Sequence, residues 1–286
     1  MTGCLRRYGL LGDPVAHSLS PSMYKAAFVH LGIEASYEAV RVPGGDLDAL
    51  AREMCDLAAS GGGNVTVPHK EDAARIVDVV RPYAKRTGAC NCFWLDDSGR
   101  LVGDNTDVGG FLHATRDLDG LDLAGAKVLL LGAGGAARAV AVACESAGVG
   151  RLDIQNRTVD RAERLIEELG LAKIARTVAV PAGSETTYDL VVNSTSLGIE
   201  PVDLPPLSFG EVTARFAFDL VYGRGGTAWT REAALARVPA IDGLSMLVRQ
   251  AVLSLERWFG VESIREGTTD AMWVAARDGL KLGSAG

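Results

Sequence analysis

Apolar and polar positions along the first part of the chain fall into short segments of two kinds. Runs that are apolar throughout or at every second position predict strands over residues 7–12, 35–42 and 64–67. Runs with apolar residues three or four positions apart predict helices over residues 21–31, 46–59 and 71–80. Ser20 is the expected N-cap of the first of these helices, and Pro21 is its first residue.

The same alternation continues through the second part of the chain. Residues 128–131 are all apolar, and a strand over 127–131 is expected to be covered on both faces of a parallel sheet. Further strands are expected over 151–155, 190–192 and 216–221, and helices over 136–147, 161–169 and 245–259. Strands that alternate with helices throughout predict α/β domains with largely parallel sheets.

Length and charge narrow the class of protein. The 286 residues are enough for two domains of roughly 100–150 residues each. Apolar residues make up 48% and charged residues 23%, which is close to the globular average and unlike a disordered chain. Acidic residues outnumber Lys and Arg by 36 to 29, and the net charge of −7 argues against a nucleic-acid partner. A few local cations must therefore bind any anionic ligand.

The N-terminal residues and the cysteines predict a cytoplasmic protein. Residues 1–11 lack an apolar run long enough for a secretory signal, and no segment approaches the roughly 20 apolar residues that span a bilayer. The five cysteines are odd in number and scattered, as in reduced cytosolic proteins. Cys90 and Cys92 form the only close pair, and no second Cys/His pair completes a zinc site, so we expect a structural role and no metal.

A glycine-rich turn joins the strand 127–131 to the helix after it. Gly132 stands where a side chain would obstruct the turn, and Gly134 and Gly135 let the backbone approach a pyrophosphate at the helix N-terminus. The spacing is Gly-x-Gly-Gly rather than Gly-x-Gly-x-x-Gly, because Ala137 replaces the third glycine. A turn of this kind can be a plain loop, but its place between strand and helix predicts a dinucleotide site. Its expected members are Gly132, Ala133, Gly134, Gly135 and Ala136.

The tip of the next strand indicates which dinucleotide binds. NAD-binding proteins carry an acidic residue about 20 positions further on, which accepts hydrogen bonds from the ribose 2′-hydroxyl. Here the strand 151–155 ends in Asn156, Arg157 and Thr158, with Arg161 following. Two guanidinium groups and no carboxylate suit a 2′-phosphate, so NADP(H) is the expected cofactor. The alternative, a pair of solvated arginines at a helix start, fits the helix dipole poorly.

Four other segments carry polar side chains that need an explanation. They contain Ser18 and Ser20, Thr66 and Lys70, Asn91 together with residues 104–107, and Gln250. Each has an ordinary structural interpretation: a helix cap for Ser20, a solvated lysine, Asx turns for the amides and carboxylates, and a snorkelling amide inside the last apolar helix. Lys70, however, comes just after a strand end, where ligands gather in α/β sheets.

Taken together and in this order, these segments resemble the shikimate dehydrogenase family over nearly the whole chain. The motifs are residues 12–21 (GDPVAHSLSP), 64–70 (NVTVPHK), 105–107 (NTD), 132–139 (GAGGAARA) with 156–158 (NRT), 193–195 (NST), 219–222 (DLVY) and 243–251 (GLSMLVRQA). Seven ordered motifs are a specific match, whereas any single one is not.

The resemblance implies an N-terminal α/β substrate domain, an inserted Rossmann-type domain and C-terminal helices that return to the first domain. The expected segments are 1–107 for the substrate-binding catalytic domain, 108–238 for the NADP-binding domain and 239–286 for the helical return. The implied activity is reversible hydride transfer between NADP(H) and the shikimate/3-dehydroshikimate pair in aromatic amino acid biosynthesis, by a monomer or homodimer. Lys70 and Asp107 are the implied catalytic pair. The implied substrate residues are Ser18, Ser20, Thr66, Asn91, Tyr222 and Gln250, and Thr195, Gly243 and Met246 join the cofactor site.

These residue types suit the implied chemistry. When hydride leaves a carbinol carbon, the hydroxyl proton must leave too, so a positioned proton acceptor is needed. Lys70 can accept this proton or stabilise alkoxide character, while Asp107 fixes its position; the sequence leaves open which of the two carries the proton. Hydroxyls and two amides can satisfy a trihydroxy carboxylate by hydrogen bonding. The nicotinamide performs the redox step, so no metal is expected.

The chain also departs from the family pattern. Met23-Tyr24 stands where His-Asn is usual, Cys92 and Val108 replace a Thr and a Gly, and Gly223-Arg224 follows Tyr222 where a proline is usual. None of these removes a residue with a chemical role. Two alternatives remain: a quinate or aminoshikimate dehydrogenase of the same family, and a catalytically silent NADP-binding regulator. Ser20 favours shikimate over quinate, and a regulator would be free to lose the catalytic pair.

Overall fold

The computed structural model describes residues 5–179, 186–199 and 203–282. The chain divides into two units, of which the first combines Met1–Thr106 with Val248–Gly286 and the second spans Asp107–Leu247. The three domain segments expected from the sequence, divided after residues 107 and 238, stay a prediction. In the described ranges, no helix has the length and apolar character needed to cross a bilayer.

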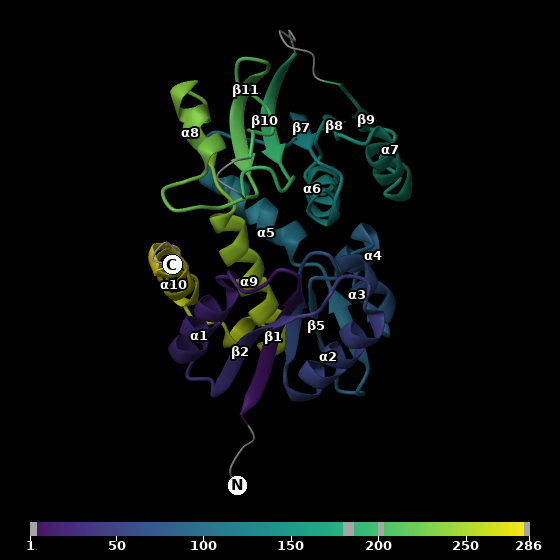
Figure 1. Cartoon of the computed structure of the whole chain (residues 1–286), viewed down its shortest axis with the longest axis vertical. Coiled ribbons are helices and arrows are strands. Elements are labelled where there is room, and N and C mark those ends of the chain that lie inside the picture. The colour runs from purple at the N-terminus through teal and green to yellow at the C-terminus, as the bar shows by residue number, and fades with distance from the viewer. Residues whose placement is uncertain (1–4, 180–185, 200–202, 283–286) are drawn as a thin grey trace. The chain divides into compact units, whose positions relative to one another are not determined.

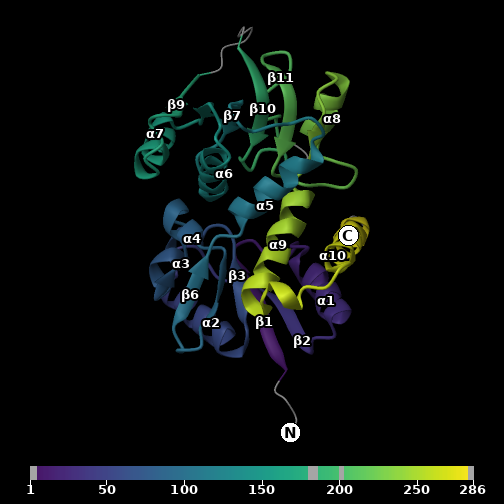
Figure 2. The same cartoon turned by 180° about the vertical axis from the view of Figure 1, so that it is seen from behind.

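The first unit is built around a six-stranded sheet with the order β2-β1-β3-β5-β6-β4. Its elements are β1 (Arg6–Gly12), α1 (Ser20–Leu31), β2 (Ala35–Arg41), α2 (Leu47–Ser60), β3 (Gly62–Val65), α3 (Lys70–Ile76), β4 (Val79–Val80), α4 (Pro82–Thr87), β5 (Cys92–Leu95), β6 (Leu101–Asp104) and α10 (Thr268–Leu282). Helix α9 (Leu244–Phe259) enters this unit at Val248. Figures 1 and 2 show α10 beside α1.

Strand direction decides which loops of the first unit meet. β1, β2 and β3 are parallel, whereas β5 is antiparallel to both β3 and β6. Because β5 runs the other way, its first residue lies at the end of the sheet where β3 and β6 finish: Cys92 pairs with Asn64 and with Asp104. The segments that follow β1, β3 and β6 and the segment that precedes β5 therefore gather at one end of the sheet.

Both faces of this sheet are covered. On one face Leu11 and Phe93 join an apolar cluster with Met54 of α2. On the other face Tyr8 of β1 contacts the ring of Trp258 of α9, with centroids 4.6 Å apart. Neighbouring residues of a strand point to opposite faces, so the sheet is the middle layer of the unit.

The second unit contains a parallel six-stranded sheet. Its elements are α5 (Asp107–Ala114), β7 (Lys127–Leu131), α6 (Gly135–Ser146), β8 (Arg151–Gln155), α7 (Val159–Glu168), β9 (Ala175–Thr177), β10 (Thr187–Asn193), β11 (Thr213–Asp219), α8 (Ala228–Leu235) and β12 (Ala240–Ile241). The sheet order is β12-β11-β10-β7-β8-β9, which Figure 1 shows from β11 to β9. Counted from the unit's own first strand, β7, this is the order 3-2-1-4-5-6 of the doubly wound dinucleotide-binding fold. The expected α/β class with a Rossmann-type unit is confirmed.

The central strand β7 is buried on both faces, as its composition predicts. Val128 and Leu130 belong to an apolar cluster that includes Val140 of α6. Leu129 and Leu131 belong to a second cluster, which includes Trp229 of α8. A parallel strand with helices over both faces needs apolar residues on both, and residues 128–131 of β7 are all apolar and buried.

Two local predictions for the first unit are wrong. The helix expected over 71–80 ends at Ile76, and β4 (Val79–Val80) pairs with β6 instead. The β-branched valines favour an extended chain, which suits the short parallel strand. Ser20 is not the N-cap of α1 either: Leu19 occupies that position, and the N–H of Ser20 donates to Ser18 Oγ at 3.2 Å. The Ser18 side chain therefore accepts a main-chain hydrogen bond at the start of α1, which is the role that the sequence predicted for Ser20.

Candidate active site

Two of the predicted substrate segments lie against each other beyond the ends of β1 and β3. The Asp13 N–H donates to the carbonyl oxygen of Val67 at 2.9 Å, and the Thr66 N–H donates to that of Leu11 at 2.8 Å. A Cβ on Gly12 would lie 2.4 Å from Thr66 Cγ2 and 2.9 Å from the Val67 carbonyl oxygen, so this approach requires glycine. The loop that carries Ser18 and the half-buried Thr66 are therefore held close together.

Lys70 is fixed through its main chain as the first residue of α3. Its carbonyl oxygen accepts a hydrogen bond from the Cys90 N–H at 2.7 Å. The preceding residue is fixed as well, because the His69 N–H donates to the carbonyl oxygen of Thr66 and the ring Nε2 lies 2.7 Å from that of Val42. The half-buried Lys70 thus stands beside the segment that leads to Asn91.

Asn91 joins three strand ends. Its N–H donates to the carbonyl oxygen of Asp104 at 3.0 Å, and its carbonyl oxygen accepts from the Val65 N–H at 3.0 Å. Its side-chain Oδ1 accepts from the Thr106 N–H at 2.7 Å, and its Nδ2 lies 3.0 Å from Thr106 Oγ1. The buried Asn91 side chain therefore shapes the turn that leads into Asp107.

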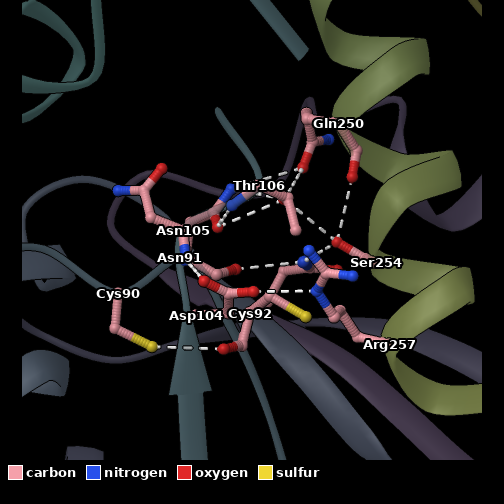
Figure 3. Close-up of polar contacts among 10 residues, drawn as sticks. Cys90, Asn91, Cys92, Asp104, Asn105, Thr106, Gln250, Ser254 and Arg257 are labelled. Atoms are coloured by element: carbon pink, nitrogen blue, oxygen red, sulfur yellow. Dashed lines mark hydrogen bonds and ion pairs between the residues drawn. The ribbon is translucent and has the colours of Figure 1, made fainter. Parts of the chain in front are cut away.

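Gln250 completes this cluster from α9. Its Oε1 lies 3.4 Å from Asn91 Nδ2 and 3.3 Å from Thr106 Oγ1 (Figure 3). Ser254, one helical turn further on, accepts a hydrogen bond from Asn64 Nδ2 at 3.0 Å. The sequence predicted Asn91 and Gln250 as site residues but missed Thr106, Asn64 and Ser254 in this role. A polar residue four positions after Gln250, on the same helix face, was the signal for Ser254.

Asp107 is the first residue of α5 and of the second unit. It directly follows Thr106, whose main-chain N–H is bound by Asn91. Asp107 lies in the first turn of α5, where the helix dipole favours a negatively charged group. Lys70 belongs to the first unit, so the pairing of these two residues stays a prediction.

The glycine turn of the second unit has the geometry that a pyrophosphate needs. Gly132 has φ +107°, and a Cβ there would lie 2.7 Å from Ser194 Oγ. A Cβ on Gly134, in contrast, would meet nothing within 4 Å. Gly134 is also the N-cap residue of α6. Because glycine has no side chain, it accepts no capping hydrogen bond from the first-turn N–H groups of α6. Open space over an uncapped helix N-terminus fits a bound anion, flanked by the half-buried Ala133, Gly135 and Ala136.

The tip of β8 presents the predicted cations. Gly132 N–H donates to the carbonyl oxygen of Gln155 at 2.8 Å, which ties the glycine turn to this tip. Asn156 Nδ2 donates to the carbonyl oxygen of Thr158 at 2.7 Å and closes the turn before α7. Arg157 and Arg161 are both exposed. These residues fit a dinucleotide with a 2′-phosphate.

A second set of polar contacts holds the segments that follow β10 and β11. Asn193 Oδ1 accepts from the N–H of Thr195 at 3.0 Å, and Asn193 Nδ2 donates to Asp219 Oδ1 at 2.8 Å. A Cβ on Gly243 would lie 2.1 Å from the Leu220 carbonyl oxygen, so this close approach also requires glycine. Thr195 and Gly243 therefore fix the loops around the end of β10 and β11.

Two further predicted residues of the second unit differ in character. Burial raises the pKa of Tyr222, so its phenol remains a hydrogen-bond donor at neutral and mildly alkaline pH. Met246 lies in the apolar cluster on the α6 side of the sheet. Tyr222 thus has the state needed to donate to a ligand, whereas Met246 contributes packing.

The structural role expected of the close cysteine pair stays a prediction, and both of its thiols are buried. The buried Cys90 thiol donates to the Cys92 carbonyl oxygen at 3.2 Å, and burial raises the pKa of Cys90 to about 12. A thiol of this kind is protonated at neutral pH and is therefore a poor nucleophile. Cys4 lies outside the described residues, and the remaining four cysteines are free.

Known proteins resemble this chain along both units. A family model for the shikimate dehydrogenase substrate binding domain matches residues 10–93, and one for shikimate / quinate 5-dehydrogenase matches residues 113–198. The shikimate dehydrogenase (NADP(+)) of Symbiobacterium thermophilum is 41% identical over 96% of this chain and 95% of its own length. That of Hyphomonas neptunium is 41% identical over 89% and 92%. The crystal structure of shikimate 5-dehydrogenase from Thermus thermophilus in complex with NADP(H) and shikimate has a TM-score of 0.82 at 38% identity, covering 96% of this chain and 100% of that one.

Proposed function

The chain belongs to the shikimate dehydrogenase family, and from this membership we infer that it catalyses the reversible, NADP-dependent reduction of 3-dehydroshikimate to shikimate, a step of aromatic amino acid biosynthesis. The structural observation that supports this most directly is the meeting of three polar segments at one end of the first sheet. They are the segment from Thr66 to Lys70, Asn91, and the turn that runs through Thr106 into Asp107.

The substrate is bound by hydroxyls and amides. Ser18, Ser20, Thr66, Asn91, Tyr222 and Gln250 are the proposed substrate residues. They supply both donors and acceptors, as a polyhydroxy carboxylate requires. Because the amides of Asn91 and Gln250 are fixed by neighbouring groups, little conformational entropy is lost when they bind a ligand.

Lys70 and Asp107 are the proposed residues for proton transfer. NADPH, when bound, supplies the hydride that reduces the substrate carbonyl carbon. The carbonyl oxygen then gains a proton, which Lys70 donates or which passes between the two residues, and the reverse reaction returns it. The charge of Lys70 also stabilises the oxyanion as it develops.

The second unit binds the cofactor. The turn from Gly132 to Ala136 accommodates the pyrophosphate at the N-terminus of α6. Asn156, Arg157, Thr158 and Arg161 surround the 2′-phosphate, with the two guanidinium groups as its charged partners. Thr195, Gly243 and Met246 are the remaining proposed members of this site.

The enzyme works in the cytoplasm, as a monomer or homodimer. Support for a reducing compartment comes from the cysteines, since none of the four in the described ranges is paired and three are buried.

The activity is tested by crossing shikimate and quinate with NADP and NAD while NADPH or NADH absorbance is followed. We expect NADP reduction with shikimate to have the highest kcat/KM of the four combinations. Faster turnover of quinate would overturn the substrate, and faster turnover with NAD would overturn the cofactor. A chain that binds NADP but oxidises neither substrate would be a silent regulator.

A further inference from the structure

One face of α9 contacts the substrate end of the first sheet through three polar side chains. Gln250, Ser254 and Arg257 are spaced four and three residues apart, so they lie along one face of the helix. Each has a partner from a different loop or strand end. Gln250 meets Asn91 and Arg257 meets Asp104 (Figure 3). Ser254 meets Asn64. Only Gln250 belongs to the proposed substrate residues.

The hydrogen bonds in this cluster have a defined direction. The main-chain N–H of Thr106 can only donate, so the Asn91 side-chain atom it meets at 2.7 Å is Oδ1. Asn91 Nδ2 therefore faces Gln250, which must present Oε1 as the acceptor. The Nε2 of Gln250 is then turned away from Asn91 (Figure 3). A flipped Gln250 amide would set two donors against each other.

Ser254 fixes the position of α9 against the end of β3. Its hydroxyl donates to the carbonyl oxygen of Gln250 at 3.0 Å, and its oxygen accepts from Asn64 Nδ2 at 3.0 Å. The Thr106 hydroxyl lies 3.2 Å away. Ser254 is fully buried, so water is excluded as a substitute for these partners.

Arg257 anchors the same face to the end of β6. Its Nε donates to Asp104 Oδ2 at 2.8 Å, and the Asp104 side chain is only 3% exposed. The other carboxylate oxygen accepts from the Asn105 N–H, and the Asp104 carbonyl oxygen accepts from the Asn91 N–H. Loss of the guanidinium would leave a buried carboxylate without its charged partner, next to the residue that orients Gln250.

We propose that Arg257 and Ser254 are positioning residues of the substrate site. They fix α9 against Asp104 and Asn64 so that Gln250 presents its Nε2 as a donor to an acceptor oxygen of the substrate. This inference rests on the proposed function, in which Gln250 contacts the substrate. It also implies that a ligand with an ammonium group at this contact is disfavoured, because an ammonium has no acceptor.

The test is steady-state kinetics of the full chain, with shikimate and NADP varied separately. Arg257→Gln should raise the KM for shikimate about tenfold or more, which is the effect of losing a charged hydrogen bond, and leave the KM for NADP unchanged. Arg257→Lys keeps the charge and should return the KM to within a few-fold of wild type. Ser254→Ala should raise it several-fold. Gln250→Glu keeps the acceptor toward Asn91 but removes the Nε2 donor, and should also raise the KM for shikimate.

The matched control is Arg100→Gln, which breaks the Arg100–Asp96 ion pair of the same unit, where the arginine side chain is 60% exposed. It should leave both KM values unchanged. If Arg257→Gln lowers the melting temperature but leaves the KM for shikimate at the wild-type value, Arg257 is only a structural residue and the proposal fails. An unchanged KM in Gln250→Glu would refute the donor role of Nε2.

Two further outcomes are informative. If Arg257→Gln fails to fold, the double variant Asp104→Asn/Arg257→Gln is used in its place, because it removes both charges of the ion pair at once. A wild-type KM in that double variant would refute the proposal, since the ion pair would then be dispensable for positioning. If wild type itself shows no shikimate-dependent NADP reduction, the proposed function fails and this inference fails with it. If wild type is active and the variants keep its KM for shikimate, the positioning role is rejected and the proposed function stands.

Discussion

The ring of Tyr24 is stacked on the ring of Tyr37, with centroids 4.1 Å apart and planes at 11°. Tyr24 is one of the positions where the chain departs from the family pattern, and its hydroxyl lies 3.4 Å from the carbonyl oxygen of Ala251 in α9. The Tyr37 hydroxyl donates to Asn64 Oδ1 at 2.8 Å. The two stacked rings thus contact the polar cluster through Asn64 and α9. At position 24 the family usually has an asparagine instead of a tyrosine.

Tyr37→Phe should destabilise the first unit. The substitution keeps the stacked ring but leaves Asn64 Oδ1 without this donor in a buried site, which costs about 1–3 kcal/mol. Thermal unfolding of the full chain should show a lower melting temperature. The control is Tyr83→Phe, which removes the same hydroxyl from a tyrosine that is 37% exposed. Equal melting temperatures for the two variants would contradict the role of the Tyr37 hydroxyl.

Lys70→Ala tests the proton-transfer role. We expect kcat to fall by roughly 10²–10⁴-fold with a modest change in the KM for shikimate, because general acid–base catalysis contributes about that factor. Lys85, in α4 of the same unit, provides the control, and Lys85→Ala should retain wild-type kcat. Activity that survives Lys70→Ala intact would show that another group carries the proton.

The sequence predicted those elements whose pattern lies within a few consecutive residues. The strands 127–131 and 151–155 were predicted with the bounds that the structure has, because each is a short run flanked by turn residues. β4, β5 and β6 have two to four residues each and were not predicted, since so short a segment carries no periodicity of its own. The glycine turn was recognisable for the same local reason, because it directly follows the apolar residues 128–131.

The cluster around Gln250 shows where sequence reasoning ends. Asn64 and Ser254 are 190 residues apart, and Asp104 and Arg257 are 153 residues apart. No spacing rule links such positions, and an arginine near a helix end normally suggests a solvated charge. Gln250 itself was predicted because the family motif contains it, whereas the contacts of Ser254 with Asn64 and of Arg257 with Asp104 became evident only from the fold.

The two glycines of the cofactor turn should respond differently to alanine. Gly132→Ala places a Cβ in a left-handed conformation 2.7 Å from Ser194 Oγ, so the variant should have a lower melting temperature. Gly134→Ala meets nothing within 4 Å and should keep the wild-type melting temperature. It should still raise the KM for NADP, because its methyl group occupies space needed by the pyrophosphate. A wild-type KM for NADP in Gly134→Ala would place the pyrophosphate elsewhere.

Arg157→Ala should weaken NADP far more than NAD. A guanidinium that binds the 2′-phosphate contributes a charge-assisted hydrogen bond, whose loss should raise the KM for NADP about tenfold or more. The KM for NAD should change little, since NAD lacks that phosphate. Arg164, an exposed arginine within α7, provides the control, and Arg164→Ala should leave both values unchanged. An equal loss for the two cofactors in Arg157→Ala would refute the assignment.

Asp219 should make the stability of the chain fall as the pH rises. Burial raises the pKa of Asp219, opposed by hydrogen bonds from Thr227, Val221 and Asn193. In the folded state this carboxyl therefore binds its proton more tightly than in the unfolded state, where the pKa is about 3.9. Its contribution to the free energy of unfolding is largest below that value, decreases as the pH rises toward the raised folded pKa, and is constant above it.

Asp189 gives the opposite sign and is the control. Its pKa is lowered, first by the hydrogen bond from the Lys127 N–H and then by Arg215. Its stabilising contribution is therefore present above about pH 3.9 and lost as the pH falls through the lowered folded pKa. Melting temperatures of wild type, Asp219→Asn and Asp189→Asn, compared from about pH 3 to pH 7, separate the two effects. Wild type should lose its advantage over Asp219→Asn as the pH rises, and over Asp189→Asn as the pH falls. A difference between wild type and Asp219→Asn that does not change with pH would contradict the raised pKa of Asp219.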